Sequence, residues 1–451
     1  MTGGDGVLTE HAAATERYVA AYRCFAANGA SSAPAWLRDL RDAGIARFAD
    51  LGFPSAGLEE WRFTSVAPIT ETAFVLPHGP TAVGDPTPFL LPGVGRHRLV
   101  FVNGRLDARL SALGGLPEGV TVASLGDALD RDPERVREHL GRSGTSGQGA
   151  FAALNTAFVA EGAYVHVRAG VEVAEPLQIL FLSTSTDIAA PVVTHPRVLV
   201  VAERLARIVL VESYAGDGVY WTNAVTEMVV GDGARADLYR IQRESERACH
   251  VGTTHAHQGR DSVVNVHPVS FGAALARHDI AVVLDGEGGR CLLNGLYLGN
   301  GSQHVDHHTV IDHAKPHCES HEYFNGVIDD RARSVFAGRI VVRPGAQRTD
   351  SKQTNNNLLL STEARADSQP QLEIYADDVK CTHGATLGPI DEKALFYLAS
   401  RGLGGDEGRA MLTYGFGAEI LGRMDVPALR EQLDGIVQGR LLGGAGRRAT
   451  R

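Results

Sequence analysis

The sequence has few lysines, and their positions exclude one common kind of nucleotide site. Only four lysines occur in the chain, and none of them follows a glycine. A Gly-Lys-Ser/Thr phosphate-binding loop is therefore absent, so any ATP that the protein's work requires must be bound by another subunit. The formal net charge of -10 disfavours nucleic acid as a partner, because that binding relies on clustered lysine and arginine facing phosphates.

Paired cysteines and long apolar runs are also missing. The five cysteines stand singly, without a CxxC pair, which argues against a zinc ribbon or a thioredoxin-like centre. No run approaches the roughly eighteen apolar residues of a membrane helix, and residues 1–10 lack the basic start of a signal peptide. We therefore expect a cytoplasmic protein that has no membrane contact and keeps free thiols, most of them buried.

Apolar residues recur at helical spacing near both ends of the chain. Two helices are predicted within Thr15–Phe53, and a further helical stretch covers Leu125–Leu140, where Asp132-Pro133-Glu134 supplies a helix start. Three more helices are predicted at Asp391–Leu398, Asp406–Ile420 and Val426–Val437. We divide the chain into a mixed, helix-rich N-terminal region (1–155), a β core (156–388) and a C-terminal helical region (389–451).

The β core has the pattern of a repeating coil. Short runs alternate apolar and polar residues, and strands follow strands without intervening helices. Turn signals, from Gly231-Asp232-Gly233 to Pro344-Gly345, recur at intervals close to multiples of about 14 residues, which favours a solenoid. We predict a mainly β protein with a right-handed parallel β-helix core, flanked by helical N-terminal and C-terminal regions. A β-sandwich remains open from the pattern alone.

Two details of this coil are also predicted. The Asn355–Asn357 run, which precedes three leucines, is expected to form a turn ladder that enters a core strand. The helices after Gly388 are expected to cap the open edge of the coil and to offer a docking surface.

A cluster of histidines between residues 304 and 321 is the first candidate site. Imidazole and thiolate are the usual protein ligands of zinc and iron. Strand parity places some of these side chains on opposite faces, and intervening turns break the parity. A metal role and a set of solvated or stacked histidines therefore both remain open. The members are His304, His307, His308, His313, His317, Cys318 and His321.

A second candidate lies in Asp377–Gly384. If this segment is extended, Cys381 and His383 point to one face, while Lys380 and Thr382 point to the other. A thiolate beside an imidazole suits transient binding of iron or sulfide, and Lys380 is a candidate for lowering the thiol pKa. A buried cysteine beside a hydrogen-bonded histidine is the alternative.

Three segments near the C-terminus resemble one known family. They are Arg348–Ser361 (RTDSKQTNNNLLLS), Asp377–Gly388, and Ala394–Leu398 with Arg401-Gly402. Together they are similar to the C-terminal half of the SufB/SufD family, scaffold proteins on which iron-sulfur clusters are assembled. Weaker similarities, such as Glu60–Thr64, extend over most of the chain. The resemblance implies a right-handed parallel β-helix between helical regions, in agreement with the pattern described above.

Within the family the sequence resembles the SufD type more than the SufB type. SufB-like chains usually carry a cysteine in the segment that matches Thr349–Leu360, and this chain has none. They also tend to read His-Glu-Ala-Thr where this chain has His383-Gly384-Ala385-Thr386. A SufB-type paralogue remains the alternative.

The resemblance also implies partners and roles. It implies a non-enzymatic scaffold that pairs with SufB through its β-helix and binds the ATPase SufC through its C-terminal helices. The candidate SufC contacts are Leu395, Phe396, Tyr397 and Arg401. His383, and less directly Cys381, would face SufB and hold iron or a nascent, transient cluster, with His383 as the metal ligand.

Other classes of function are weighed against this scaffold. The carboxylate pairs Asp329-Asp330 and Asp377-Asp378 could serve a β-helix polysaccharide-active enzyme, although only 6% of residues are aromatic. A stand-alone metalloenzyme would use the histidine cluster. The sequence leaves open the cluster type, the subunit that holds it, flavin binding, and a homodimer in place of the heterocomplex.

Overall fold

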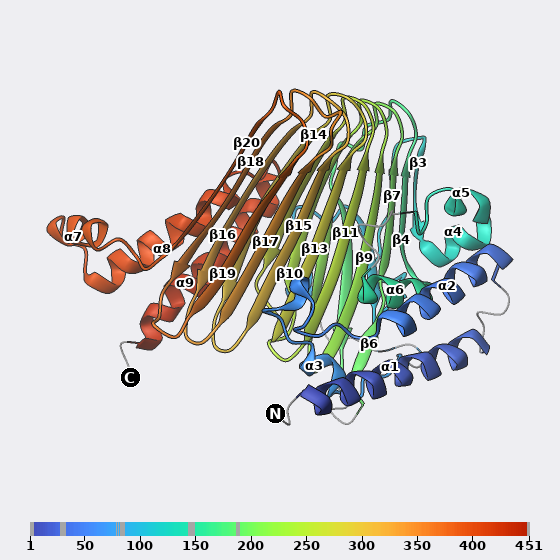
Figure 1. Cartoon of the computed structure of the whole chain (residues 1–451), viewed down its shortest axis with the longest axis horizontal. Helices are drawn as coiled ribbons and strands as arrows, with labels where there is room; N and C mark the ends of the chain where they lie inside the picture. The colour runs from blue at the N-terminus through green and yellow to red at the C-terminus, as the bar shows by residue number, and fades with distance from the viewer. Residues whose placement is uncertain are drawn as a thin grey trace.

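A computed structural model shows a coil of two facing β-sheets, with helices from both ends of the chain around it (Figure 1). Within the described part of the chain, no helix is both long enough and apolar enough to cross a membrane. The structure describes residues 4–27, 33–77, 79, 81, 86–142, 149–185 and 190–448.

Within these residues, each sheet has ten strands. The first sheet is ordered β2 (Arg105–Leu106), β1 (His97–Val102), β5 (Leu177–Thr184), β8 (Arg207–Asp217), β10 (Arg235–Arg243), β12 (Val263–Ser270), β14 (Arg290–Gly299), β16 (Glu319–Ile328), β18 (Asp350–Leu359), β20 (Lys380–Gly388). The second is ordered β19 (Arg365–Ile374), β17 (Arg333–Val342), β15 (His304–His313), β13 (Leu275–Leu284), β11 (Cys249–Gln258), β9 (Tyr220–Val230), β7 (Arg197–Ala202), β4 (Gly162–Val167), β3 (Val120–Ser124), with β6 (Val192–Thr194) beside β9.

From β8 onward the chain alternates between the two sheets and pairs each strand in parallel with the strand one coil earlier. Arg207, Arg235 and Val263 occupy the same position on successive coils, 28 residues apart. The predicted interval of about 14 residues is thus half a coil. The predicted parallel β-solenoid, which has about seven turns, is confirmed. The β-sandwich alternative is wrong, because the sheets of such sandwiches are antiparallel.

Glycine permits the close stacking of the turns between these strands. The turn signals that begin at Gly231, Gly259 and Asp285 each fall between consecutive strands. A Cβ atom at Gly286 would lie 2.0 Å from the backbone nitrogen of Arg260 in the turn of the preceding coil. Only a residue without a side chain fits where one turn packs on the next.

The interior between the sheets changes character along the coil. Most of it is filled by buried aliphatic and aromatic side chains, which drive folding by leaving water. On β18 the inward-facing, buried side chains are instead Ser351, Gln353, Asn355 and Asn357. The Asn355–Asn357 run therefore lies within a strand, so the predicted turn ladder is wrong. Asn355 donates to the Tyr297 hydroxyl at 3.0 Å, which explains its burial.

The N-terminal helices pack around the first coils. They are α1 (Gly4–Ala27), α2 (Ala35–Leu51), α3 (Ala67–Thr70), α4 (Leu125–Arg131), α5 (Pro133–Arg137) and α6 (Ala150–Ala157), with short 3-10 turns at Glu59–Trp61 and Thr87–Phe89. The two predicted helices within Thr15–Phe53 are confirmed. The start at Asp132-Pro133 is also confirmed, since the Asp132 carboxylate accepts from the Arg135 backbone N–H.

The C-terminal helices are α7 (Glu392–Ser400), α8 (Gly405–Leu421) and α9 (Pro427–Arg448), close to the predicted ranges. On α9, Leu429, Leu433 and Val437 are fully buried, and they share one apolar cluster with Tyr239 and Leu296 of the first sheet. Helices α8 and α9 therefore cover the outer face of that sheet. The predicted capping of the open edge is wrong, because α8 packs on β14 and β16 rather than on β19 or β20, the strands that end the two sheets.

Candidate functional site

The last strand, β20, places Cys381 and His383 on its inward-facing side. Cys381 pairs in register with Ser351 of β18, and His383 pairs with Gln353; both β18 side chains point into the interior. The interior is open here, because β20 is the terminal strand of its sheet. Cys381 is half-buried and His383 is exposed. The sequence prediction that these two side chains share a face is confirmed.

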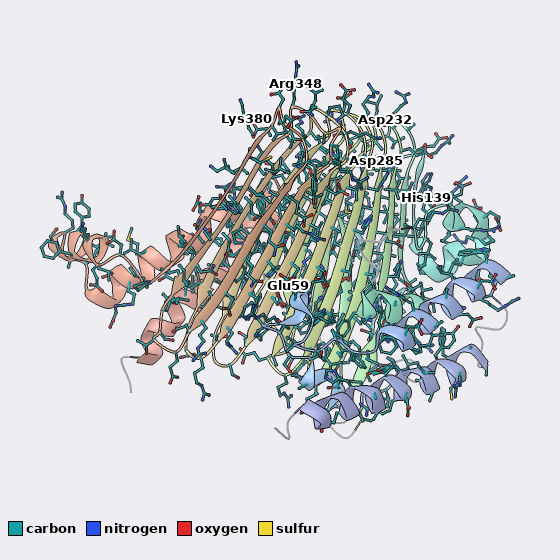
Figure 2. All side chains as sticks on the ribbon, in the orientation of Figure 1. Glu59, His139, Asp232, Asp285, Arg348 and Lys380 are labelled. Carbon is teal, nitrogen blue, oxygen red and sulfur yellow. The ribbon has the colours of Figure 1, made fainter. Side chains whose placement is uncertain are left out.

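The surroundings of Cys381 favour its protonated form. Burial raises the pKa of the Cys381 thiol, and the carboxylate of Asp350 adds to the increase. Lys380, labelled in Figure 2, begins β20. It lies in register with Asp350 on the neighbouring strand. The suggestion that Lys380 lowers this pKa is wrong, because burial and a nearby negative charge both penalise the thiolate.

Two rows of buried polar side chains run inward from this pair. Behind Cys381, the hydroxyls of Ser351 and Ser320 lie 2.7 Å apart, and Ser320 hydrogen-bonds His313 at 2.9 Å. Behind His383, the Gln353 amide donates to the Glu322 carboxylate at 2.6 Å. Behind each site residue, therefore, the side chains one and two coils further in are hydrogen-bonded to each other.

Glu322 is a strongly perturbed group in these rows. Its side chain is buried, and desolvation raises the pKa of its carboxyl to about 7, with the hydrogen bond from Gln353 acting in the opposite direction. Sequence reasoning missed both Glu322 and Gln353. The coil period could have found them, because Gln353 lies 30 residues before His383, and Glu322 lies 31 residues before Gln353.

The structure separates the histidine cluster of residues 304–321. His307 and His313 face the interior from β15, while His308 faces outward and pairs with Asp306 at 3.0 Å. His317 and His321 are exposed, on a turn and on the outer face of β16 respectively. Across the described residues no group of three or more His, Cys, Asp or Glu side chains is arranged to hold a metal ion.

The carboxylate pairs are also far apart. Asp329-Asp330 lies in the turn from β16 to β17, which leads from the first sheet to the second. Asp377-Asp378 lies in the turn from β19 to β20, which leads back. Because these turns are at opposite edges of the coil, strands of ten residues, about 33 Å long, separate them. They do not form the close acid–base pair that glycoside hydrolysis requires.

Helix α7 presents aromatic side chains to solvent. Phe396 is 77% exposed and Tyr397 is 58% exposed, while Leu395 is half-buried against α8. The Arg401 guanidinium lies 5.3 Å from the centre of the Tyr397 ring. Among the described elements α7 packs mainly on α8, and it extends away from the sheets (Figure 1). An exposed apolar surface on a projecting helix is typical of a docking site.

Comparison with known proteins identifies the family. The sequence model of the SUF system FeS cluster assembly SufBD core domain matches residues 181–416, which include both Cys381 and His383. The model of the SufBD protein N-terminal region matches residues 12–179. The chain belongs to the SufBD family. It is thus an iron-sulfur cluster assembly protein by family, as the C-terminal resemblance predicted.

Curated SufBD relatives match over most of their length. An iron-sulfur cluster assembly SufBD family protein of Synechocystis sp. is 33% identical over 394 residues, covering 85% of this chain and 86% of the relative. The iron-sulfur cluster assembly protein SufD of Escherichia coli is 29% identical, covering 87% of this chain and 90% of the relative. SufD of Bacillus subtilis is 27% identical, covering 90% of this chain and 94% of the relative.

Proposed function

We propose that this chain is a SufD-type, non-enzymatic scaffold subunit that pairs with SufB through the open end of its solenoid and binds the ATPase SufC through α7. At the SufB contact, His383, assisted by Cys381, holds iron or a nascent cluster as cargo. Cluster chemistry of this kind takes place in the assembled complex, and the ATP is bound by SufC. The cytoplasmic location stays a prediction from the sequence.

One observation carries this proposal: Cys381 and His383 share one side of the strand that ends the coil. Two side chains are fewer than the four ligands that iron in a cluster or a tetrahedral site takes. A partner that supplies the remaining ligands at this end would complete the set. Cys381 and His383 therefore suit an iron site whose remaining ligands come from a partner subunit.

The end of the coil also has the properties of a pairing surface. Among the described strands none pairs with the outer side of β20, and such an edge is a template for another strand. Tyr375, at 61% exposure, and Leu387, at 57%, add apolar surface beside it. A related β-solenoid would cover both the edge and these side chains.

The role of His383 is tested in the co-expressed complex with SufB and SufC. His383→Ala should leave assembly of the three proteins intact and lower the iron and acid-labile sulfide of the purified complex severalfold. His321→Ala is the matched control, because His321 is an exposed histidine on the outer face of the same sheet. Equal cluster content in His383→Ala and His321→Ala would refute the assigned role.

SufC docking is tested separately from SufB pairing. The double change Phe396→Ala and Tyr397→Ala removes the exposed aromatic surface of α7 and should weaken SufC binding by about 2 kcal/mol or more, the range of interface hot spots. Tyr375→Ala, on the open end, should leave SufC binding unchanged and weaken SufB pairing. Pull-down with each partner measures both effects, and full SufC retention by the α7 variant would exclude this docking surface.

A further inference from the structure

The residue behind His383 is a glutamine with an unusual environment. Gln353 is fully buried and pairs in register with His383, so the two inward-facing side chains are neighbours about 4.8 Å apart along the sheet. Glu322 occupies the same position one coil further in. The row thus runs from a buried carboxyl, through an amide, to an exposed imidazole.

Contacts on two sides hold the Gln353 amide. Its Nε2 donates to Glu322 Oε2 at 2.6 Å. Gly338 of β17, on the opposite sheet, provides the space for this amide, since a Cβ atom there would lie 2.1 Å from Gln353 Nε2. The NH2 group of Gln353 thus faces Glu322, whose Oε2 can accept this hydrogen bond either as a carboxylate oxygen or as the carbonyl oxygen of the neutral acid.

This orientation leaves the other end of the amide unused. Gln353 Oε1 is buried and has no hydrogen-bond partner among the described residues. A buried carbonyl oxygen without a donor is costly, so such an atom indicates a donor that reaches it in the working state. The neighbouring side chain that carries a mobile N–H group is His383.

We propose that Gln353 is a positioning residue, whose Oε1 accepts a hydrogen bond from one ring N–H of His383. This bond fixes the tautomer of the imidazole and leaves the other ring nitrogen free to bind a metal cation at the open end. Glu322 acts through Gln353 by holding the amide in the required orientation. The inference rests on the proposed function of His383 as the ligand of incoming iron.

Nitrogen NMR of the full chain tests this arrangement directly. In protein labelled with 15N-histidine, long-range proton–nitrogen spectra report which ring nitrogen carries the proton, and His383→Ala assigns the His383 signals. Wild type should show one tautomer for His383. Gln353→Leu should convert these signals to the averaged mixture of a free imidazole and weaken binding of Fe2+ by about tenfold, as loss of an outer hydrogen bond to a ligand does.

Two further variants make the test decisive. Gly338→Ala keeps every hydrogen-bonding group but displaces the Gln353 amide, so it should reproduce the tautomer mixture even if Gln353→Leu does not fold. Gln258→Leu makes the same change at a fully buried glutamine of β11, four coils away from His383. This variant should leave the His383 signals unchanged.

The outcomes separate this inference from the function on which it rests. An unchanged His383 tautomer in both Gln353→Leu and Gly338→Ala would overturn the positioning role. Loss of the single tautomer in these variants, combined with unaltered Fe2+ binding by His383→Ala, would support the positioning role and refute the proposed function instead.

Discussion

The buried carboxyl of Glu322 predicts a specific pH dependence of stability. Its pKa is about 7 in the folded chain against 4.5 for the exposed group, a difference of 2.5 units, or about 3 kcal/mol at 1.36 kcal/mol per unit. Between pH 4.5 and about 7, Glu322 binds fewer protons in the unfolded chain than in the folded chain. The contribution of Glu322 to the free energy of unfolding therefore falls as the pH rises through this range and is constant above about 7. Glu322→Gln removes the titration but keeps an acceptor for Gln353.

Relative to that of wild type, the free energy of unfolding of Glu322→Gln should therefore rise by about 2 to 3 kcal/mol as the pH is raised from 5 to 8.5. The neighbouring histidines do not obscure this change: burial lowers the pKa of His307 to about 3 and that of His313 to about 4, so both are neutral in the folded chain over this range, and their titration in the unfolded chain is the same in both proteins and cancels in the difference. Cys291, whose pKa Glu322 helps to raise, stays protonated throughout. Denaturant unfolding followed by circular dichroism measures the difference.

The exposed residue Glu363 provides the control for this prediction. Glu363→Gln makes the same side-chain change at the surface and should leave the difference from wild type independent of pH. If the difference between Glu322→Gln and wild type is also constant from pH 5 to 8.5, the folded chain does not hold Glu322 as a neutral acid. The reasoning from burial would then fail.

Three other changes test the packing and the site. Arg277→Ala leaves the buried Asp306 carboxylate without its guanidinium at 2.9 Å and should cost about 3–5 kcal/mol, measured as a lower free energy of unfolding; a loss below about 1 kcal/mol would contradict this. Iodoacetamide at pH 8 should alkylate Cys381 more slowly than the exposed Cys24, since burial raises the pKa of Cys381, and mass spectrometry should not find equal rates. Leu433→Ala should weaken the attachment of α9 by about 2–5 kcal/mol and speed proteolytic release of the C-terminal helices, and an unchanged cleavage rate would argue against this packing.

Local patterns predicted much of this molecule, because they depend on residues close together in the chain. The alternation within strands and the recurring turn signals favoured a parallel coil, since each coil repeats the same short-range constraints. The shared face of Cys381 and His383 follows in the same way from a spacing of two residues within one strand. The position of Asn355–Asn357 was missed, because asparagine favours turns, and hydrogen bonds to residues of neighbouring coils, such as that of Asn355 to the Tyr297 hydroxyl, satisfy these side chains inside a strand.

By itself, therefore, the sequence determined the fold class, the family and the shared face of Cys381 and His383. The tertiary structure alone decided which distant side chains meet. Register over 30 and 31 residues places Gln353 and Glu322 behind His383, and the turns that set this register also carry His317 and His321 away from His307 and His313. The tertiary structure also sets the pKa of Cys381, which burial and the carboxylate of Asp350 both raise. The free energy of a charge depends on everything packed around it, not only on its neighbours in the chain.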